Sequence, residues 1–312
     1  MTTIAHWLIP CLRQVQVLKQ TNRLSHALLI TGADGVGQEQ LAREMVKDLM
    51  CESNQAAACK ECHSCQLMRA DTHPDFRVLD GEAASIKVDQ VRLLVRQINQ
   101  KPQVGQNKVV LITHAQAMNV NAANAVLKAL EEPADRTYFV LTSSQSTSLL
   151  PTIRSRCLLV NVPTPTVDDV KDWLLQYPEH QELSSLFWLT TQPFRLLSIQ
   201  QQGKTKMYAA LPDQLSAMLT GSGSISEMLK GIDSNNIDDF CNGLAAILHQ
   251  CICHSTGAPL DEALQAIYAT LMARQGIQLL MLRYQSLQKL KSDLKKTNLN
   301  PIMQLTHELN QW

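Results

Sequence analysis

Aromatic residues are scarce in this chain, and neither charge sign is in excess. Phe, Trp and Tyr together make up 4% of the 312 residues, too few for a surface on which single-stranded bases stack in series. Lys plus Arg (28) equals Asp plus Glu (28), so no overall positive field holds a nucleic-acid backbone. Any contact with nucleic acid is therefore expected to be local.

Long apolar runs are also missing. No run approaches the roughly 18 residues that span a bilayer, and the start, from Met1 to Trp7, lacks a basic stretch followed by a long apolar one. These two absences predict no membrane partner and a cytoplasmic location. With 45% apolar and 18% charged residues, the chain is typical of a globular protein of two or three domains.

The first half of the chain alternates strand-like and helix-like segments. Because parallel strands need helical crossovers, this alternation predicts an α/β fold with a parallel sheet covered on both faces. Apolar runs predict strands at 27–31, 76–79, 109–112, 138–141 and 157–160, and helical spacing of apolar residues predicts helices at 38–50, 88–98 and 122–130.

Pro163 and Pro165 interrupt this pattern, because alternate prolines continue neither a strand nor a helix. We expect an α/β module over 1–163, a small helical segment over 164–203 and an all-helical domain over 204–312. The helices predicted beyond the boundary lie at 168–175, 183–189, 194–202, 237–251 and 264–290.

A glycine-rich loop stands between the first predicted strand and its helix, where a phosphate-binding loop belongs. It contains Gly32, Gly35 and Gly37, followed by Gln38 and Glu39. The functional pattern G-x-x-x-x-G-K-[ST] needs a lysine for the terminal phosphates and a hydroxyl for Mg²⁺. Here an uncharged amide and a carboxylate replace these groups, so we expect the glycines to remain as a tight turn that does not bind ATP.

The strand at 109–112 has lost its charged groups as well. In a nucleotide hydrolase of this type an acidic pair follows this strand, holding Mg²⁺ and polarising water. This chain continues with Thr113 and His114. Loss at two separate positions predicts that the chain neither binds nor hydrolyses nucleotide well.

Four cysteines crowd into fifteen residues, at Cys51, Cys59, Cys62 and Cys65. In a reducing compartment this spacing favours a metal site over disulfides, and four thiolates suit tetrahedral Zn²⁺. A shell closed by four sulfurs leaves no open position for water, so the zinc is expected to be structural. We interpret the competing ligands His63 and His73 as ordinary surface histidines.

The other five cysteines are interpreted as core thiols. Cys251, Cys253 and His254 suggest a ligand set, but residues two apart on a helix point to different faces. A basic group near the end of the chain is interpreted as a solvated helix face; its members are Arg283, Lys289, Lys291, Lys295 and Lys296.

Taken together, the glycine loop, the run Asn124 to Pro133 and the run Thr152 to Cys157 resemble the bacterial clamp-loader subunits of the AAA+ class. The degenerate loop and the cysteine insert at 51–65 resemble most closely the delta-prime family of DNA polymerase III. The resemblance implies an AAA+ module, a helical lid and a helical collar. It also implies a hetero-oligomeric ring that uses ATP to load the sliding clamp onto primed DNA.

Within the resemblance, Ser155, Arg156 and Cys157 match the Ser-Arg-Cys motif that supplies an arginine finger to the ATP of a neighbouring subunit. Arg156 is the principal candidate, with Ser155 beside it and Arg154 as a competing assignment. Without the resemblance, Arg156 would be expected to pair with a local surface carboxylate. At the lid position of a nucleotide-sensing arginine the chain has Phe194, with Arg195 one place further.

The sequence thus predicts a non-hydrolysing clamp-loader subunit. Its implied partners are the ATPase subunits and the clamp-opening subunit, with the sliding clamp and primed DNA reached through the complex. The polymerase activity of the holoenzyme would reside in other subunits. Two alternatives are an active ATP-binding motor subunit of the same complex and an AAA+-like regulatory binding protein outside replication.

Overall fold

The computed structural model describes residues 4–53, 55–82, 84–98, 100–294 and 300–312. The chain divides into two compact units. The first holds 1–169 with 192–194, and the second holds 170–191 with 195–312. This division places 164–169 and 192–194 in the first unit and the rest of 164–203 with the later helices, so the three-part organisation remains a prediction.

The first unit is built on one five-stranded sheet in which every pairing is parallel. The strand order is β2-β3-β4-β1-β5, which places β4 between β1 and β3. A parallel sheet covered by helices was predicted from the alternation of segments and is confirmed. The strands are β1 (Ala27–Thr31), β2 (Phe76–Asp80), β3 (Lys108–Thr113), β4 (Thr137–Ser143) and β5 (Leu158–Asn161).

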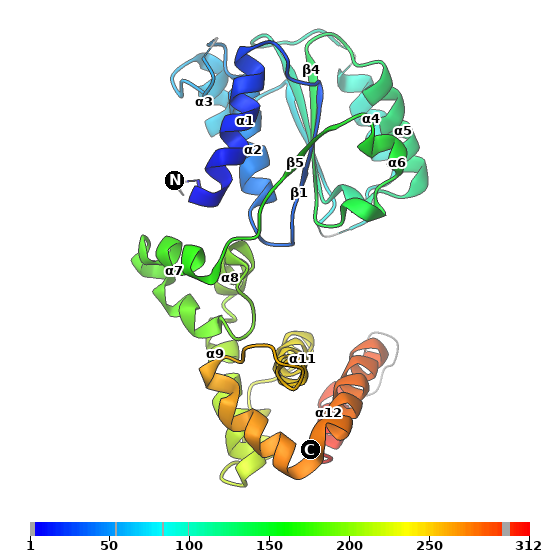
Figure 1. Cartoon of the computed structure of the whole chain (residues 1–312). Helices are drawn as coiled ribbons and strands as arrows, with labels where there is room; N and C mark the ends of the chain where they lie inside the picture. Colours follow the sequence, from blue (N-terminus) through cyan, green and yellow to red (C-terminus); the bar gives the residue numbers. More distant parts are fainter. Residues whose placement is uncertain (1–3, 54, 83, 99, 295–299) are drawn as a thin grey trace. The chain divides into compact units, whose positions relative to one another are not determined.

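Helices cover both faces of this sheet (Figure 1). α1 (Ile9–Gln20) and α2 (Gln38–Met50) lie on one face. α4 (Val88–Ile98), α5 (Val120–Glu131) and α6 (Pro151–Arg154) lie on the other. Since successive side chains of a strand point to opposite faces, each strand contributes to both cores. Beside α4 and α5 the core includes the fully buried side chains of Leu29, Val110, Ile112 and Leu141.

Short elements complete the first unit. α3 (His63–Arg69) lies within the cysteine segment. The 3₁₀ turns are η1 (His6–Leu8), η2 (Ala115–Ala117) and η3 (Ser146–Ser148). The predicted helices at 38–50 and 88–98 coincide with α2 and α4, whereas α1 and α3 were not predicted.

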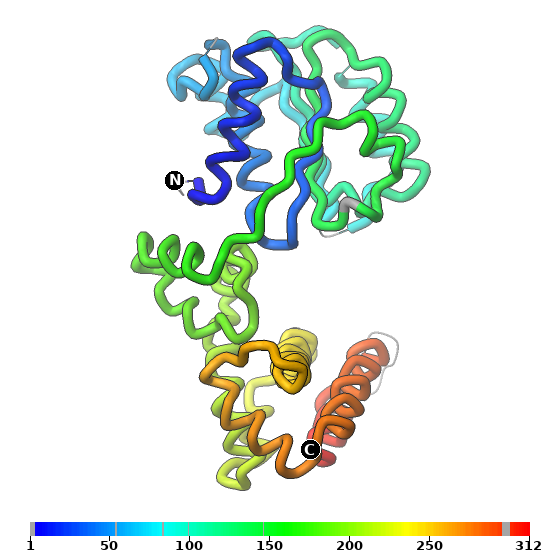
Figure 2. Tube along the Cα trace, in the orientation of Figure 1, coloured from blue at the N-terminus to red at the C-terminus, as the bar shows by residue number. Residues whose placement is uncertain are grey.

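The regular elements of the second unit, within its described residues, are α-helices and 3₁₀ turns. The helix predicted at 264–290 is interrupted at Gly276, whose φ of 67° and ψ of 172° are not helical. The trace bends sharply there (Figure 2). The elements are α7 (Val167–Leu175), η4 (Pro178–Leu186), α8 (Pro193–Gln201), α9 (Thr205–Thr220), α10 (Ile225–Met228), α11 (Ile237–His254), η5 (Glu262–Leu264), α12 (Gln265–Leu294) and α13 (Pro301–Leu309).

Two further interpretations of the sequence concern the basic group near the end of the chain and the membrane. Lys295 and Lys296 of the basic group lie outside the described residues. Among the described helices, none is both long and apolar enough to cross a membrane.

Candidate functional site

The glycine loop connects β1 to α2 as the sequence predicts. Gly37 has a φ of 109° and directly precedes Gln38, the first residue of α2. Glycine reaches this left-handed region without the steric cost that a Cβ imposes. The local fold of a phosphate-binding loop, with glycines before a helix N-terminus, is therefore present.

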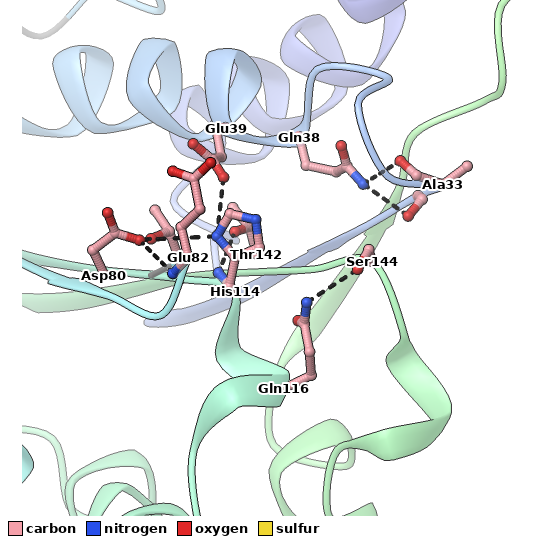
Figure 3. A network of polar contacts seen from close by, with 11 residues as sticks. Ala33, Gln38, Glu39, Asp80, Glu82, His114, Gln116, Thr142 and Ser144 are labelled. Atoms are coloured by element: carbon pink, nitrogen blue, oxygen red, sulfur yellow. Dashed lines mark hydrogen bonds and ion pairs between the residues drawn. The ribbon is translucent and has the colours of Figure 1, made fainter. Parts of the chain in front are cut away.

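The carbonyl groups of this loop are bonded to other parts of the first unit. The Gln38 amide Nε2 donates to Gly32 O at 2.7 Å and to Ala33 O at 2.6 Å, as Figure 3 shows for Ala33. Two further donors come from elsewhere in the chain. Phe194 N–H donates to Gly35 O at 3.0 Å, and Trp7 Nε1 donates to Val36 O at 2.8 Å.

Side chains also pack directly against the last glycine. A methyl group added to Gly37 would lie 2.7 Å from Cε2 of Phe194 and 2.9 Å from Cδ1 of Leu8. Phe194 is the residue at the expected position of a nucleotide-sensing arginine, and its ring lies against the loop. An apolar ring thus packs against the last glycine of the loop.

Glu39, which replaces the Mg²⁺-binding hydroxyl, faces the residues after β2 and β3 (Figure 3). His114 Nδ1 lies 3.2 Å from Glu39 Oε1 and 3.9 Å from Asp80 Oδ1. Burial raises the pKa of the Glu39 carboxyl, and His114 opposes that effect. A hydrogen bond of 2.7 Å from Thr113 Oγ1 lowers the pKa of Asp80. Glu39, in place of the motif's hydroxyl, and His114, in place of an acidic residue, are therefore in mutual contact.

The four clustered cysteines lie together after α2. Their Sγ atoms all lie within 4.8 Å of one another, with Cys51 3.5 Å from Cys59 and 4.0 Å from Cys62. A tetrahedral shell with Zn–S bonds of about 2.3 Å separates its sulfurs by about 3.8 Å. The donor set and its spacing therefore fit a metal ion of this kind.

Backbone groups of the same segment point at the sulfurs. The N–H groups of Cys59, Cys62 and Cys65 donate to the Sγ of Cys51, Cys59 and Cys62, at 3.3, 3.3 and 3.4 Å. Burial acts to raise the pKa of Cys51, but hydrogen bonds from Cys59 and Ser53 lower it to about 6. The thiolate is the form of cysteine that ligates metal, and the shift at Cys51 favours it, whereas burial raises the pKa of Cys65 to about 12.

The interpretation of His73 as a surface residue is wrong, because its side chain is buried. Asp75 N–H donates to His73 Nδ1 at 3.1 Å, so the proton resides on Nε2, which donates to Ser64 Oγ at 2.8 Å. Ser64 Oγ in turn donates to Met50 O at 2.6 Å. Burial lowers the pKa of His73 and keeps the ring neutral for this relay. His63 is exposed, as predicted.

Arg156 lies just after α6, and its side chain is partly exposed. Its Nη1 donates to Thr152 O at 2.9 Å and to Ser155 Oγ at 3.4 Å. Its Nη2 lies 2.6 Å from Glu131 Oε1, at the end of α5. In the chain taken alone, Arg156 thus pairs with a local carboxylate, as expected from the residues without the family resemblance.

Two comparisons with known proteins identify the family. The family model described as "DNA polymerase III, delta subunit" matches residues 10–166, which include the loop, the cysteines and Arg156. The chain is 35% identical over 300 residues to DNA polymerase III subunit delta' of Pseudomonas aeruginosa, covering 92% of each chain. The chain belongs to the delta' subunits of DNA polymerase III. The delta' subunit of Escherichia coli is 37% identical over 171 residues, covering 54% of this chain and 51% of that protein.

A solved structure of a gamma subunit-related protein from Thermotoga maritima also aligns with this delta' chain. It covers 96% of this chain and 98% of that one, with 20% identity and a TM-score of 0.46. The predicted resemblance to the delta-prime family is confirmed by the curated relatives and the family model.

Several residues of the site were missed by the sequence reasoning. Trp7 and Leu8 lie far from the loop in the sequence, and no motif marks them. Glu131 lies in the run Asn124 to Pro133, but nothing in the sequence places it beside Arg156. Ser64, between two cysteine ligands, had no such signal.

Proposed function

We propose that this delta' chain is a non-hydrolysing member of the clamp loader that acts on nucleotide held by its neighbours. Its partners would be the ATPase subunits on one side and the clamp-opening subunit on the other. The sliding clamp and primed DNA would be reached through the complex. The relatives named delta' support this placement, as does 28% identity over 218 residues to DNA polymerase III subunit tau of Escherichia coli.

The non-hydrolysing role is supported above all by the contacts that the glycine loop makes within the chain. Its carbonyls bond to Gln38, Phe194 and Trp7, and the ring of Phe194 lies against Gly37. Gln38 supplies no positive charge, and Glu39 places a carboxylate at the first turn of α2. A triphosphate would meet repulsion from Glu39 without the cation that normally compensates its charge.

In this proposal Arg156 acts in trans as the arginine finger. A planar guanidinium that reaches a neighbour's triphosphate stabilises charge on the transferring phosphoryl group, worth about 10³- to 10⁵-fold in rate in other nucleotide hydrolases. Ser155 supports it by accepting from Nη1. Arg156→Ala is expected to leave assembly intact and to lower ATP hydrolysis by the complete complex.

The cysteine cluster would hold a structural Zn²⁺ through Cys51, Cys59, Cys62 and Cys65. Four sulfur ligands close the shell, so the ion supplies no open coordination site for chemistry. Its contribution would be to fix the segment 51–65 against the end of α2.

The test of the non-hydrolysing role is equilibrium binding of Mg–ATP to the isolated chain, measured by calorimetry. We expect no saturable binding at micromolar concentrations. A chain with Gln38→Lys and Glu39→Thr provides the comparison, since it restores the lysine and the hydroxyl of the motif and removes the carboxylate. Micromolar affinity of the unaltered chain would contradict the proposal and favour an active motor subunit.

A further inference from the structure

Arg156 is held from two directions in this chain. On one side Nη1 donates to the backbone carbonyl of Thr152 at 2.9 Å. On the other, Nη2 lies 2.6 Å from Oε1 of Glu131. The carbonyl belongs to the turn that carries Arg156 itself, whereas the carboxylate comes from a different helix. Glu131 is therefore the part of this arrangement that can be exchanged without unfolding the turn.

Glu131 is fixed in place by its helix. It is the last residue of α5, whose buried side chains Ala122, Val126 and Leu130 pack into the core beside the sheet. Pro133 follows two residues later and prevents the helix from continuing. The carboxylate therefore projects from a rigid helix end toward the guanidinium.

The pair remains accessible to an incoming anion. The side chains of Arg156 and Glu131 are 35% and 48% exposed. An ion pair this exposed is weak, because water screens both charges. A triphosphate carries several negative charges and can bind the guanidinium fork through more than one oxygen. It therefore competes effectively with a single carboxylate.

We propose that Glu131 is a positioning residue that holds Arg156 in the free chain and gives it up to the terminal phosphates of a nucleoside triphosphate on the adjoining subunit. This inference rests on the proposed arginine-finger function. Before contact, the carboxylate keeps a long side chain in one orientation. On contact, the phosphates replace the carboxylate as the partner of Nη2. The ion pair with Glu131 therefore lowers the affinity of Arg156 for the neighbour's nucleotide by a small, constant factor.

The charge of Glu131 can be removed with little change of shape. Glu131→Gln retains an oxygen that accepts from Nη2 but lacks the negative charge. Glu132→Gln is the matched control, because it removes the same charge one residue later, at an exposed position. Arg156→Ala, alone and combined with Glu131→Gln, completes a double-mutant cycle.

The experiment measures ATP hydrolysis by the reconstituted, DNA-stimulated complex as a function of ATP concentration. Loss of the Glu131 charge strengthens the contact of Arg156 with bound nucleotide and with the transition state equally. The substitution should therefore change the half-saturating ATP concentration and leave the maximal rate unchanged. We expect Glu131→Gln to lower the half-saturating ATP concentration about 1.5- to 5-fold, the range of exposed ion pairs. Glu132→Gln should not change it. In the Arg156→Ala background, Glu131→Gln should have no further effect.

The outcomes separate the two proposals. If Arg156→Ala lowers hydrolysis and Glu131→Gln leaves half-saturation unchanged, the positioning role of Glu131 is wrong and the arginine finger stands. The same shift in the Arg156→Ala background would also overturn the inference, because the effect would not pass through Arg156. If Arg156→Ala leaves hydrolysis unchanged, the proposed function itself fails, and the role of Glu131 fails with it.

Discussion

Gln38 occupies the position at which a phosphate-binding loop carries lysine, and its amide bonds to the carbonyls of Gly32 and Ala33. The side chain is buried, so its polar atoms need such partners. The substitution that removes the cation therefore also satisfies backbone groups of the loop. The Phe194 ring adds apolar packing against Gly37.

Single residues were predicted from the sequence to different degrees. The cysteine ligand set follows from spacing, and the structure brings all four Sγ atoms together. The missing cation at Gln38 and the added carboxylate at Glu39 follow from comparison with the motif. Burial of His73 could not be predicted, because its partners Ser64 and Asp75 lie in a local fold that no periodicity reveals.

Gly37→Ala should destabilise the first unit by about 2–4 kcal/mol. The left-handed φ costs a residue with a Cβ about 1–2 kcal/mol, and crowding against Phe194 and Leu8 adds about 1–2 kcal/mol. Urea unfolding measures the change. Gly105→Ala is the matched control, since its φ is 69° but its added Cβ would meet only ordinary contacts at 3.8 Å or more. Equal losses in the two variants would contradict the contact with Phe194 and Leu8.

Among the elements, α2 shows how one helix connects two sites. Its N-terminus carries the degenerate loop and its C-terminus carries the cysteine segment. The last carbonyls of a helix lack partners within it, and here other elements supply them. Asp48 O accepts from Lys19 Nζ, Leu49 O from Asn107 Nδ2 at 2.7 Å, and Met50 O from Ser64 Oγ.

The elements that the sequence predicted well are those with strong apolar periodicity, such as α2 and α4. Only Cys11 and Val15 of α1 are buried, which leaves little pattern to detect. At 183–189 a helix was predicted where η4 ends at Leu186. The break in α12 at Gly276 was missed, because the apolar spacing continues across it.

Ser64→Ala should lower the free energy of unfolding by about 2–3 kcal/mol. The change leaves the buried Met50 carbonyl without this donor and His73 Nε2 without its acceptor, and at the lower end of the cost of an unsatisfied buried group each loss costs about 1–1.5 kcal/mol. Denaturant unfolding of the metal-loaded protein measures it. Ser148→Ala removes a comparable bond to Gln145 O at an exposed site and should change stability by less than about 0.5 kcal/mol. A similar effect of both substitutions would show that the relay through Ser64 is not stabilising.

In the molecule as a whole, the cysteine segment and the sheet have separate sources of stability. The sheet has an apolar core whose strands are fully buried at positions such as Leu29, Val110 and Leu141. The segment 51–65 has few buried apolar side chains and depends on its sulfurs and on the bonds to α2. Metal removal should therefore act locally.

The purified, reduced protein should contain one equivalent of zinc, measured by elemental analysis. Chelation should speed hydrogen exchange at the amides of Cys59, Cys62 and Cys65, whose N–H groups bond to sulfur, and leave exchange in β1, β3 and β4 slow. Cys62→Ser should reduce the zinc content, whereas Cys253→Ser, outside the cluster, should not. Absence of zinc, or cooperative unfolding of the whole chain on chelation, would refute this prediction.

The covered glycine loop also limits how this lineage can change. Lysine at position 38 would place a cation at a buried site, and arginine at position 194 would press a charged group against Leu8 and Gly37. Either substitution alone is expected to lower the stability of the first unit. A lysine and an arginine placed at positions 38 and 194 would therefore need further substitutions around the loop that accommodate them.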